Sequence, residues 1–411
     1  MNLDDTESAA ARDAFPRSPL FVVEVSEPDV ELEGWLVVHS SIFGGASGGV
    51  RILPDVDRRE VELLAEAMTC KYSFHRIRRG GAKCGIKLPL NLPDGERARR
   101  LRRFGEHLAP LIRSREFRPW TDMNCTPADL ASILGGAGVA AVPTAGQSSG
   151  YTGLSTMAGV MAAAEHHELA PAECAISIEG FGSVGRELAA EIARWGGVLI
   201  GVSTVAGAVA NPAGLDVDEL LSASHSGDDW VRKPGRWENI PREELLALPM
   251  KIHVPCARVH SISLGVAGKL ACEAVVPAAN APCTPEARQA LASRGVTLLP
   301  DFVTNSGGVI GPRFAHSGAS AQAVRSFFLS DFKDMLARLL RAAERESSSA
   351  VELAMRESRR NFNALSREDR EPRRPPRKGF LAGRRSRRSR GRSRTGAEVE
   401  EILRFTQARF T

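Results

Sequence analysis

One short stretch, Cys174 to Trp195, constrains the fold of this chain more than any other part of its sequence. It opens with an apolar run, Ala175 to Ile178, that has the alternation of a buried strand. The turn GFGSVG follows at once, and Val184, Leu188 and Ile192 then recur at the spacing of one helix face. A strand, a glycine-rich turn and a helix in this order are typical of the first unit of a doubly wound sheet that binds a dinucleotide.

Each glycine of that turn has its own physical role. Gly180 allows the tight turn out of the strand, Gly182 lets a pyrophosphate approach the backbone, and Gly185 lets the helix pack close to the strand. The N–H groups at the helix start, where Ser183 and Val184 lie, and the helix dipole would favour the anion. A tight turn without a ligand is the alternative that this motif alone leaves open, because glycine-rich turns are common.

The length and composition are those of an ordinary globular protein. At 411 residues, with 43% apolar and 25% charged residues, the chain is long enough for one or two domains and a tail. No apolar run approaches the ~20 residues of a membrane span, and the N-terminus is acidic and polar rather than a secretion signal. We therefore expect a cytoplasmic protein without a membrane association. The seven cysteines are scattered without the spacing of a zinc site, which predicts reduced thiols and no bound metal.

The net charge of +5 is concentrated near the C-terminus. The segment Arg367 to Arg394 reads REDREPRRPPRKGFLAGRRSRRSRGRSR and can account for the excess by itself. It lacks apolar periodicity, which indicates a solvated, disordered tail. A contact with the phosphates of a nucleic acid or with another anionic surface is the second interpretation. The absence of an aromatic platform for base stacking favours the first.

Apolar patterning and turn residues predict alternating strands and helices along the rest of the chain. One helix begins at Asp57, with Glu60 in capping-box spacing, and another begins at Thr284. Lys71 continues the apolar stripe of the first helix, which is unusual for a lysine. The alternation predicts a parallel, doubly wound sheet. Strands are expected at 21–25, 35–40, 198–203, 252–257 and 274–276, and helices at 97–112, 152–168, 215–222 and 320–360, with a last turn at 399–405.

Five motifs follow one another between residues 40 and 315. They are MTCKYSFHRIRRGGAKCGI (68–86), PWTDMNCTPADL (119–130), GFGSVG (180–185), AANAPCTPEA (278–287) and PDFVTNSGGV (300–309). Together they resemble the motifs of the glutamate, leucine, phenylalanine and valine dehydrogenase family, and their order is far more specific than the glycine-rich turn alone. The resemblance implies two domains with the active site in the cleft between them, an NAD or NADP cofactor, and a homo-oligomer assembled through the first domain.

The expected fold is α/β, with an N-terminal α/β dimerisation-type domain followed by a Rossmann-like doubly wound nucleotide-binding domain. Residues 19–148 would form the substrate-binding, catalytic and oligomerisation domain, and residues 149–318 the NAD(P)-binding domain. A helix at 319–360 would return to the first domain. Residues 1–18 are expected to be disordered, and the arginine-rich tail, 361–411, mostly so. The small, polar residues from Pro143 to Gly150 form the candidate hinge.

Oxidative deamination of an amino acid needs a base, a proton carrier and a cation for the α-carboxylate. By resemblance, Lys83 is the base that activates water, Asp122 carries protons to and from the substrate amine, and Lys71 binds the α-carboxylate. A lysine near other cations and away from water loses its proton more readily, which lets it act near neutral pH. The resemblance also implies substrate contact for Asn305 and cofactor contacts for Asn280, Thr152 and Ser183.

Two positions depart from the pattern of glutamate-specific members. Ser47 stands where they have a lysine, and Pro312 where they have a serine, so both contacts to a side-chain carboxylate are missing. Because an unpaired carboxylate costs several kcal/mol to bury, an apolar amino acid is the favoured substrate, with Ser47 in an atypical pocket. At the end of the second nucleotide strand, Ser203 and Thr204 replace the acid that NAD-preferring folds carry. Thr204 is expected to contact the cofactor, and the choice between NAD and NADP stays open.

The sequence therefore predicts an NAD(P)-dependent L-amino-acid dehydrogenase that reversibly converts an amino acid to a 2-oxo acid and ammonia. One alternative is a glutamate dehydrogenase with an atypical pocket. The other is a non-catalytic, NAD(P)-binding regulatory relative, which the presence of Lys71, Lys83 and Asp122 together speaks against.

Overall fold

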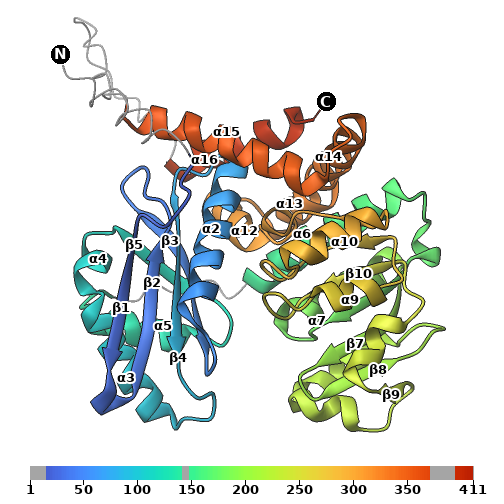
Figure 1. Ribbon diagram of the computed structural model, residues 1–411, viewed down its shortest axis with the longest axis horizontal. Helices are drawn as coiled ribbons and strands as arrows, with labels where there is room; N and C mark the ends of the chain where they lie inside the picture. The colour runs from blue at the N-terminus through green and yellow to red at the C-terminus, as the bar shows by residue number, and fades with distance from the viewer. Residues whose placement is uncertain (1–14, 141–147, 371–393, 411) are drawn as a thin grey trace, which may run out of the picture.

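The computed structural model describes residues 15–140, 148–370 and 394–410. Two α/β domains lie side by side, and helices from the C-terminal part of the chain run across the top of both (Figure 1). Most of residues 1–18, most of the expected hinge and most of the arginine-rich segment lie outside the described residues. In the part of the chain that the structure describes, no helix has both the length and the apolar character needed to cross a membrane.

The first domain is built on a mixed five-stranded sheet with the order β1-β2-β4-β3-β5. β2 pairs antiparallel with β1 and β4, whereas β3 pairs parallel with β4 and β5. Gly48 allows β3 to approach β4, because a Cβ atom there would stand 1.6 Å from the Ala82 carbonyl oxygen. The strands are β1 (Phe21–Glu27), β2 (Leu32–Val38), β3 (Ala46–Leu53), β4 (Gly80–Lys87) and β5 (Phe117–Thr121).

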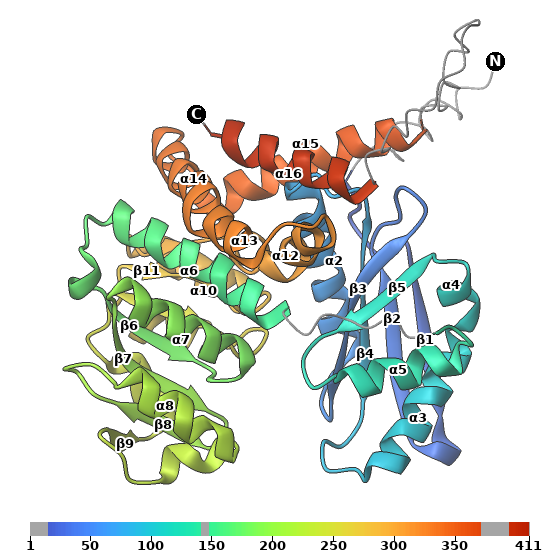
Figure 2. The same ribbon diagram turned by 180° about the vertical axis from the view of Figure 1, so that it is seen from behind.

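Helices cover both faces of this sheet (Figures 1 and 2). α2 (Arg58–Phe74) packs on one face, and α3 (Asp94–His107), α4 (Ala109–Arg113) and α5 (Pro127–Gly136) cover the other. α2 begins as predicted, because the Asp57 side chain accepts a hydrogen bond from the Glu60 N–H at 2.8 Å. Two glycines of β4 let α2 lie against the strand, since a Cβ atom at Gly81 or Gly85 would stand 2.2 or 2.4 Å from an α2 atom. Lys83, between them, shares this covered face.

The second domain has a seven-stranded sheet with the order β12-β11-β10-β6-β7-β8-β9. The strands from β12 to β7 are parallel. The expectation of a purely parallel sheet is wrong at one edge, because β8 pairs antiparallel with both β7 and β9. The turn between β7 and β8 is too short for a crossover helix, so the chain can only reverse there. The strands are β6 (Ala175–Glu179), β7 (Val198–Thr204), β8 (Gly207–Ala210), β9 (Glu238–Ile240), β10 (Ile252–Pro255), β11 (Ala274–Val275) and β12 (Thr297–Leu298).

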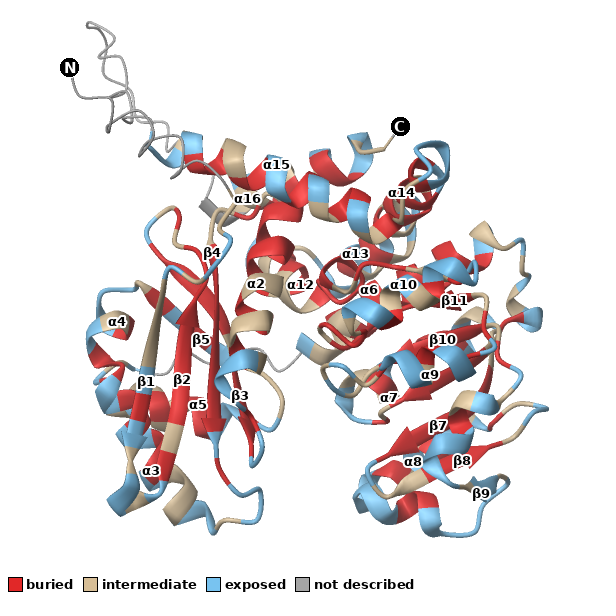
Figure 3. Ribbon diagram, in the orientation of Figure 1, coloured by how far each residue is buried: buried red, intermediate tan, exposed pale blue. Residues whose placement is uncertain are grey.

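Two apolar clusters, one on each face of this sheet, confirm the doubly wound, Rossmann-like arrangement. α6 and α7 bury their apolar residues on one face, and α9 and α10 on the other. Figure 3 shows buried residues along the strands of both sheets and on the inner sides of the helices. α10 starts as predicted, because the Thr284 hydroxyl accepts a hydrogen bond from the Ala287 N–H at 3.2 Å. The helices are α6 (Ser148–His166), α7 (Ser183–Trp195), α8 (Val217–Ala223), α9 (Leu264–Lys269), α10 (Pro285–Ser293), α11 (Asp301–Thr304) and α12 (Gly307–His316).

The single long helix expected at 320–360 is wrong. The segment consists of α13 (Ala321–Phe327), a π-helical stretch η6 (Phe328–Phe332), α14 (Lys333–Arg345) and α15 (Ala350–Arg370). The chain turns between α14 and α15, where Ser347 has a φ of +50° and Ser349 accepts the Glu352 N–H at 3.1 Å as a new N-cap. α15 does return to the first domain, where Ser358 and Asn361 donate hydrogen bonds to backbone carbonyls of α2. The last helix is α16 (Arg394–Ala408), longer than the expected turn.

Candidate active site

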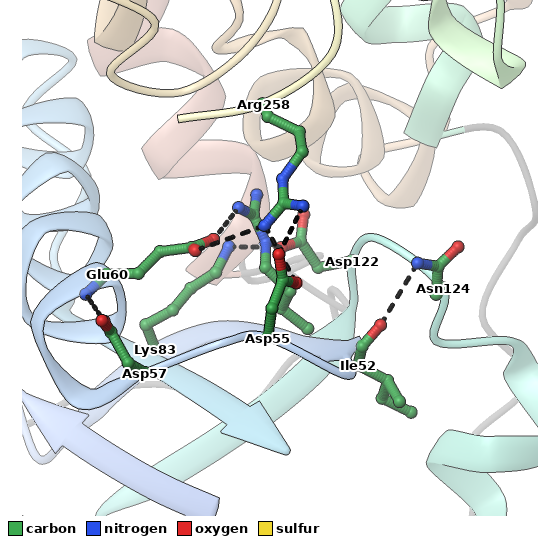
Figure 4. A network of polar contacts seen from close by, with 9 residues as sticks. Ile52, Asp55, Asp57, Glu60, Lys83, Asp122, Asn124 and Arg258 are labelled. Atoms are coloured by element: carbon green, nitrogen blue, oxygen red, sulfur yellow. Dashed lines mark hydrogen bonds and ion pairs between the residues drawn. The ribbon is translucent and has the colours of Figure 1, made fainter. Parts of the chain in front are cut away.

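The predicted base and the predicted proton carrier meet on the α2 face of the first sheet. The Lys83 Nζ atom lies 2.7 Å from Asp122 Oδ2 (Figure 4). Burial lowers the pKa of the Lys83 ammonium, the Asp122 carboxylate opposes this, and the Arg51 guanidinium adds to the lowering. Burial alone would raise the pKa of Asp122, yet the charges of Lys83 and Arg51 hold it well below its usual range. The pair is therefore an ionised carboxylate against a lysine that gives up its proton more easily than usual.

Sequence reasoning missed two charged residues that hold this pair in place. Arg51 Nε lies 3.1 Å from Asp122 Oδ2, and Arg51 Nη1 lies 2.6 Å from Glu60 Oε1. The Arg51 side chain is 3% exposed, so it is a buried cation between two carboxylates. Such charge-assisted hydrogen bonds fix the orientation of the carboxylate. The period of β3 carried the signal, because Arg51 lies two residues after Gly49 and thus on the same face of the sheet.

Gly49 makes the room in which the pair sits. A Cβ atom at this position would stand 2.6 Å from Asp122 Cβ and 3.4 Å from Lys83 Nζ. Gly49 also pairs with Trp120 across the β3–β5 ladder, so the Trp120 side chain leaves the sheet on the face that carries Lys83. Any larger residue at position 49 would occupy space beside Lys83 and Asp122.

The predicted α-carboxylate ligand, Lys71, lies near the same pair although it comes from α2. Burial lowers the pKa of its ammonium to about 8, and the charge of Lys83 adds to the lowering. The Lys71 Nζ atom donates to Asn280 Oδ1 at 3.3 Å, and Asn305 Nδ2 donates to the same oxygen at 3.1 Å. The structure thus brings Lys71 from the first domain together with two predicted asparagines from the second.

The single hydrogen-bond donor of the Ser47 hydroxyl is used within the protein. It donates to the Arg118 carbonyl at 3.1 Å and accepts a hydrogen bond from Trp120 Nε1–H at 2.8 Å. Ser47 is buried, whereas the Trp120 side chain that it holds is 46% exposed. Pro312, the other departure, lies inside α12 and has no backbone N–H to offer. Neither position presents a cation or a free donor for a second carboxylate.

The glycine-rich loop fits a dinucleotide. Gly180 has a φ of +102°, which favours glycine, and a Cβ atom at Gly185 would stand 2.4 Å from the Gly180 carbonyl oxygen. At the N-cap of α7, Gly182 offers no side-chain cap, and a Cβ atom there would meet nothing within 4 Å. The first N–H groups of α7, which begins with Ser183 and Val184, are therefore left to a ligand such as a pyrophosphate.

Two further predicted cofactor residues, Thr152 and Thr204, use their hydroxyls in hydrogen bonds within the protein. Thr152 is on α6 and donates to the Ser148 carbonyl at 2.9 Å. The hydroxyl of Thr204, at the end of β7, donates to the Asp228 carbonyl at 3.0 Å, so it serves the fold. Arg232, which the sequence analysis did not connect with the cofactor, lies beside this end of β7. Arg232 Nε donates to the Ala206 carbonyl at 3.1 Å, and its side chain is 68% exposed.

A second missed arginine connects the two domains across the site. Arg258 follows β10 in the second domain, and its two terminal nitrogens lie 2.8 and 3.1 Å from the carboxylate of Asp55 in the first domain. Arg258 Nη2 also lies 3.9 Å from Glu60 Oε2. Figure 4 shows Arg258 reaching from above toward Asp55 and Glu60, next to Lys83 and Asp122.

Known proteins match the chain over most of its length. Residues 21–137 match the model of the Glu/Leu/Phe/Val dehydrogenase dimerisation domain, and residues 146–365 match that of glutamate/leucine/phenylalanine/valine dehydrogenase. A glutamate dehydrogenase of Thermotoga maritima is 33% identical over 345 residues, which are 79% of this chain and 81% of that protein. An NAD-specific glutamate dehydrogenase of Halobacterium salinarum is 30% identical over 303 residues, 70% of this chain and 69% of that protein.

The fold is also similar to those of solved amino-acid dehydrogenase structures. A hetero-hexameric glutamate dehydrogenase from Thermus thermophilus, in a leucine-bound form, superposes with a TM-score of 0.74 at 25% identity, covering 89% of this chain and 96% of that one. An L-tryptophan dehydrogenase from Nostoc punctiforme shares the fold, with a TM-score of 0.58 at 22% identity, over 88% of this chain and 99% of that one. With both domains matched, the chain belongs to the glutamate, leucine, phenylalanine and valine dehydrogenase family.

Proposed function

We propose that this protein catalyses the NAD(P)-dependent oxidative deamination of an L-amino acid to a 2-oxo acid and ammonia, in both directions. The observation that carries the proposal is the Lys83–Asp122 pair, 2.7 Å apart, next to the buried ammonium of Lys71. A lysine with a lowered pKa, an ionised carboxylate and a cation for the substrate are the groups that this reaction requires.

Each of these residues has one task in the proposal. Lys71 holds the α-carboxylate of the substrate, within reach of Asn280 and Asn305. The dinucleotide, when bound on the glycine-rich loop, supplies the hydride acceptor. Neutral Lys83 takes a proton from the water that attacks the substrate iminium carbon, and the new C–O bond replaces the C–N bond as ammonia leaves. Asp122 carries the proton that ammonia needs to depart.

We further propose an apolar substrate side chain rather than that of glutamate. The Ser47 hydroxyl already donates to the Arg118 carbonyl and accepts a hydrogen bond from Trp120, and Pro312 has no hydrogen-bond donor. The exposed indole of Trp120 offers apolar surface on the face that carries Lys83. A carboxylate placed there would be desolvated without a partner. Glutamate remains the second candidate, because the relatives named above include glutamate dehydrogenases.

The proposal includes a homo-oligomer and a cytoplasmic location. The first domain matches a dimerisation-domain model, and a structurally similar relative is hexameric. All seven cysteines are free, which fits a reducing compartment.

The test is an ammonia-dependent oxidation assay with the full chain, NADH or NADPH, and a panel of 2-oxo acids. We expect the highest kcat/KM for an oxo acid with an apolar side chain. The highest value for 2-oxoglutarate would show that the enzyme is a glutamate dehydrogenase with an atypical pocket. Tight binding of NADH or NADPH without turnover of any 2-oxo acid would mean a non-catalytic regulatory relative.

Two variants of Trp120 test the side-chain preference. Trp120→Ala removes the apolar surface and is expected to lower kcat/KM for the best apolar substrate about tenfold, roughly the worth of one to two buried methylene groups. Trp120→Phe, the matched control, keeps most of that surface and loses only the hydrogen bond to Ser47. Equal losses in both variants would mean that the hydrogen bond, rather than the apolar surface, matters.

A further inference from the structure

Charges of alternating sign run from the second domain to Lys83. Arg258 lies 3.9 Å from Glu60, Glu60 lies 2.6 Å from Arg51, and Arg51 lies 3.1 Å from Asp122. Asp122 in turn lies 2.7 Å from Lys83 (Figure 4). Only the first member of this row, Arg258, belongs to the second domain. A movement of the domains apart would therefore remove one cation from the row and leave the rest in place.

The position of Arg258 depends on the nucleotide loop. Ala257, its neighbour in the chain, packs on Gly180, where a Cβ atom would stand 3.0 Å from the Ala257 nitrogen. The backbone of Arg258 therefore lies next to the glycine-rich loop, and its guanidinium contacts Asp55 and Glu60 of the other domain. A shift of the second domain as a rigid unit carries the loop and the guanidinium together.

We propose that Arg258 is a positioning residue: when the two domains close, its guanidinium reaches Asp55 and Glu60 and thereby favours the neutral form of the Lys83 amine. This inference rests on the proposed function, in which neutral Lys83 is the base. It goes further in making the base more available when the site is closed.

The direction follows from the charges that face Lys83. Asp122, next to β5, and Glu60, on α2, both raise the pKa of Lys83, whereas burial and Arg51, on β3, lower it. Lys71, also on α2, is a second cation in repulsion with Lys83. In the closed form Arg258 offsets part of the Glu60 charge, so Glu60 stabilises the Lys83 ammonium less. When the domains separate, Glu60 recovers that influence and Lys83 holds its proton more firmly.

Asp55 has the separate task of holding the guanidinium by two hydrogen bonds. Arg258 is 44% exposed and Asp55 57% exposed, so their ion pair adds little net stability and can break as the domains move. A buried pair at this place would resist opening and slow the release of product. The exposure of the pair therefore suits a contact that forms and breaks in each turnover.

The test measures the protonation of Lys83 directly, without turnover. Competitive labelling with trace acetic anhydride across a pH series, read by mass spectrometry of the peptide that contains Lys83, gives the pH at which its amine becomes neutral. In the full chain saturated with NADH, Arg258→Gln is expected to move this midpoint upward by about half a unit, a threefold change in the neutral fraction at lower pH. Arg103→Gln is the control, because Arg103 is 50% exposed and pairs with Glu27 away from the site.

Kinetic measurements distinguish an electrostatic effect of Arg258 on Lys83 from a role in which Arg258 only holds the two domains together. For Arg258→Gln, the rising limb of the pH profile of kcat/KM should move to higher pH, with less loss on the alkaline side. Asp55→Asn should raise KM with little movement of the limb, because Arg258 can still approach Glu60. A labelling midpoint for Arg258→Gln that equals wild type, or that moves downward, would overturn the inference. Absence of wild-type turnover would instead refute the proposed function, and the labelling result would still decide the role of Arg258.

Discussion

Replacing Gly49 with alanine is expected to misplace Asp122 while the rest of the fold stays intact. The new Cβ atom would stand 2.6 Å from Asp122 Cβ, whereas ordinary contacts begin near 3.4 Å. Asp122 must therefore retreat by about 1 Å, the gap between that contact and the optimal separation of carbon atoms. Because the clash is at Cβ, a rotamer change of Asp122 cannot relieve it. Lys83 Nζ, at 3.4 Å, need not move.

The expected magnitude follows from this displacement. A misplacement of about 1 Å at reacting groups costs about 100-fold in rate, equivalent to about 2.7 kcal/mol of activation free energy. The extra methyl group also costs roughly 1–3 kcal/mol of folding stability, as overpacking does elsewhere. The glycine-rich loop belongs to the other domain, so the affinity for NADH or NADPH should stay within about twofold of wild type, a difference of less than 0.5 kcal/mol.

The assay is steady-state oxidation of NADH or NADPH with ammonia and the best 2-oxo acid, together with fluorescence titration of the dinucleotide. Gly95→Ala is the matched control, because Gly95 is exposed on α3 and a Cβ atom there meets nothing within 4 Å. Gly48→Ala marks the other extreme, since its Cβ would stand 1.6 Å from a β4 carbonyl oxygen and should prevent folding. A folded Gly49→Ala protein that keeps more than a third of wild-type kcat would refute the reasoning.

Three further predictions concern single charges. Lys83→Met should abolish turnover at every pH while the dinucleotide still binds. In the wild-type protein, kcat/KM should rise as the pH passes through the lowered pKa of Lys83, because only the neutral amine acts as the base. Lys71→Met should raise the free energy of unfolding in urea at pH 7. The buried ammonium, with its pKa lowered from 10.5 to about 8, costs the wild-type protein up to about 3 kcal/mol, and the variant avoids this cost. The lost hydrogen bond to Asn280 reduces the gain by about 1 kcal/mol. That gain should shrink as pH rises from about 8 to 10.5, where the native lysine loses its charge, and a constant difference would contradict the assignment. Arg232→Glu should raise the KM for NADPH about tenfold and the KM for NADH much less. The reason is that the guanidinium lies beside the end of β7, where the cofactor ribose binds in this fold. Equal changes in KM for both cofactors would contradict this role of Arg232.

The sequence predicted those parts of the site that lie within a continuous motif. Lys83 sits between Gly81 and Gly85 in one strand, so the motif itself places it on the face that α2 covers. Lys71 continues the apolar stripe of α2, which correctly indicated burial. The glycine-rich turn also correctly predicted the start of α7, where we propose that the anion binds. In each case local geometry alone determines where the residue lies.

Contacts made between distant segments were not predictable in this way. Arg51 is recognisable as a partner of Asp122 only once β3 and β5 are known to be neighbours. Arg258 and Asp55 are brought together by the packing of one domain on the other, and no spacing in the chain encodes that. The break between α14 and α15 was missed because the apolar period continues across it, while the turn depends on the left-handed conformation of Ser347.

In the proposed reaction, the two lysines of the site need opposite protonation states, and the charges around them act on that balance. Lys71 must stay charged to hold a carboxylate, while Lys83 must be neutral to act as a base, although burial lowers the pKa of both. A bound α-carboxylate would neutralise Lys71 and remove its repulsion of Lys83, which by itself would raise the pKa of the base at the moment when it is needed. Arg51 and, in the closed form, Arg258 act in the opposite direction through Asp122 and Glu60. Domain closure thus offsets the effect of substrate binding on the pKa of Lys83, so the base stays available after the substrate has bound only if the domains also close.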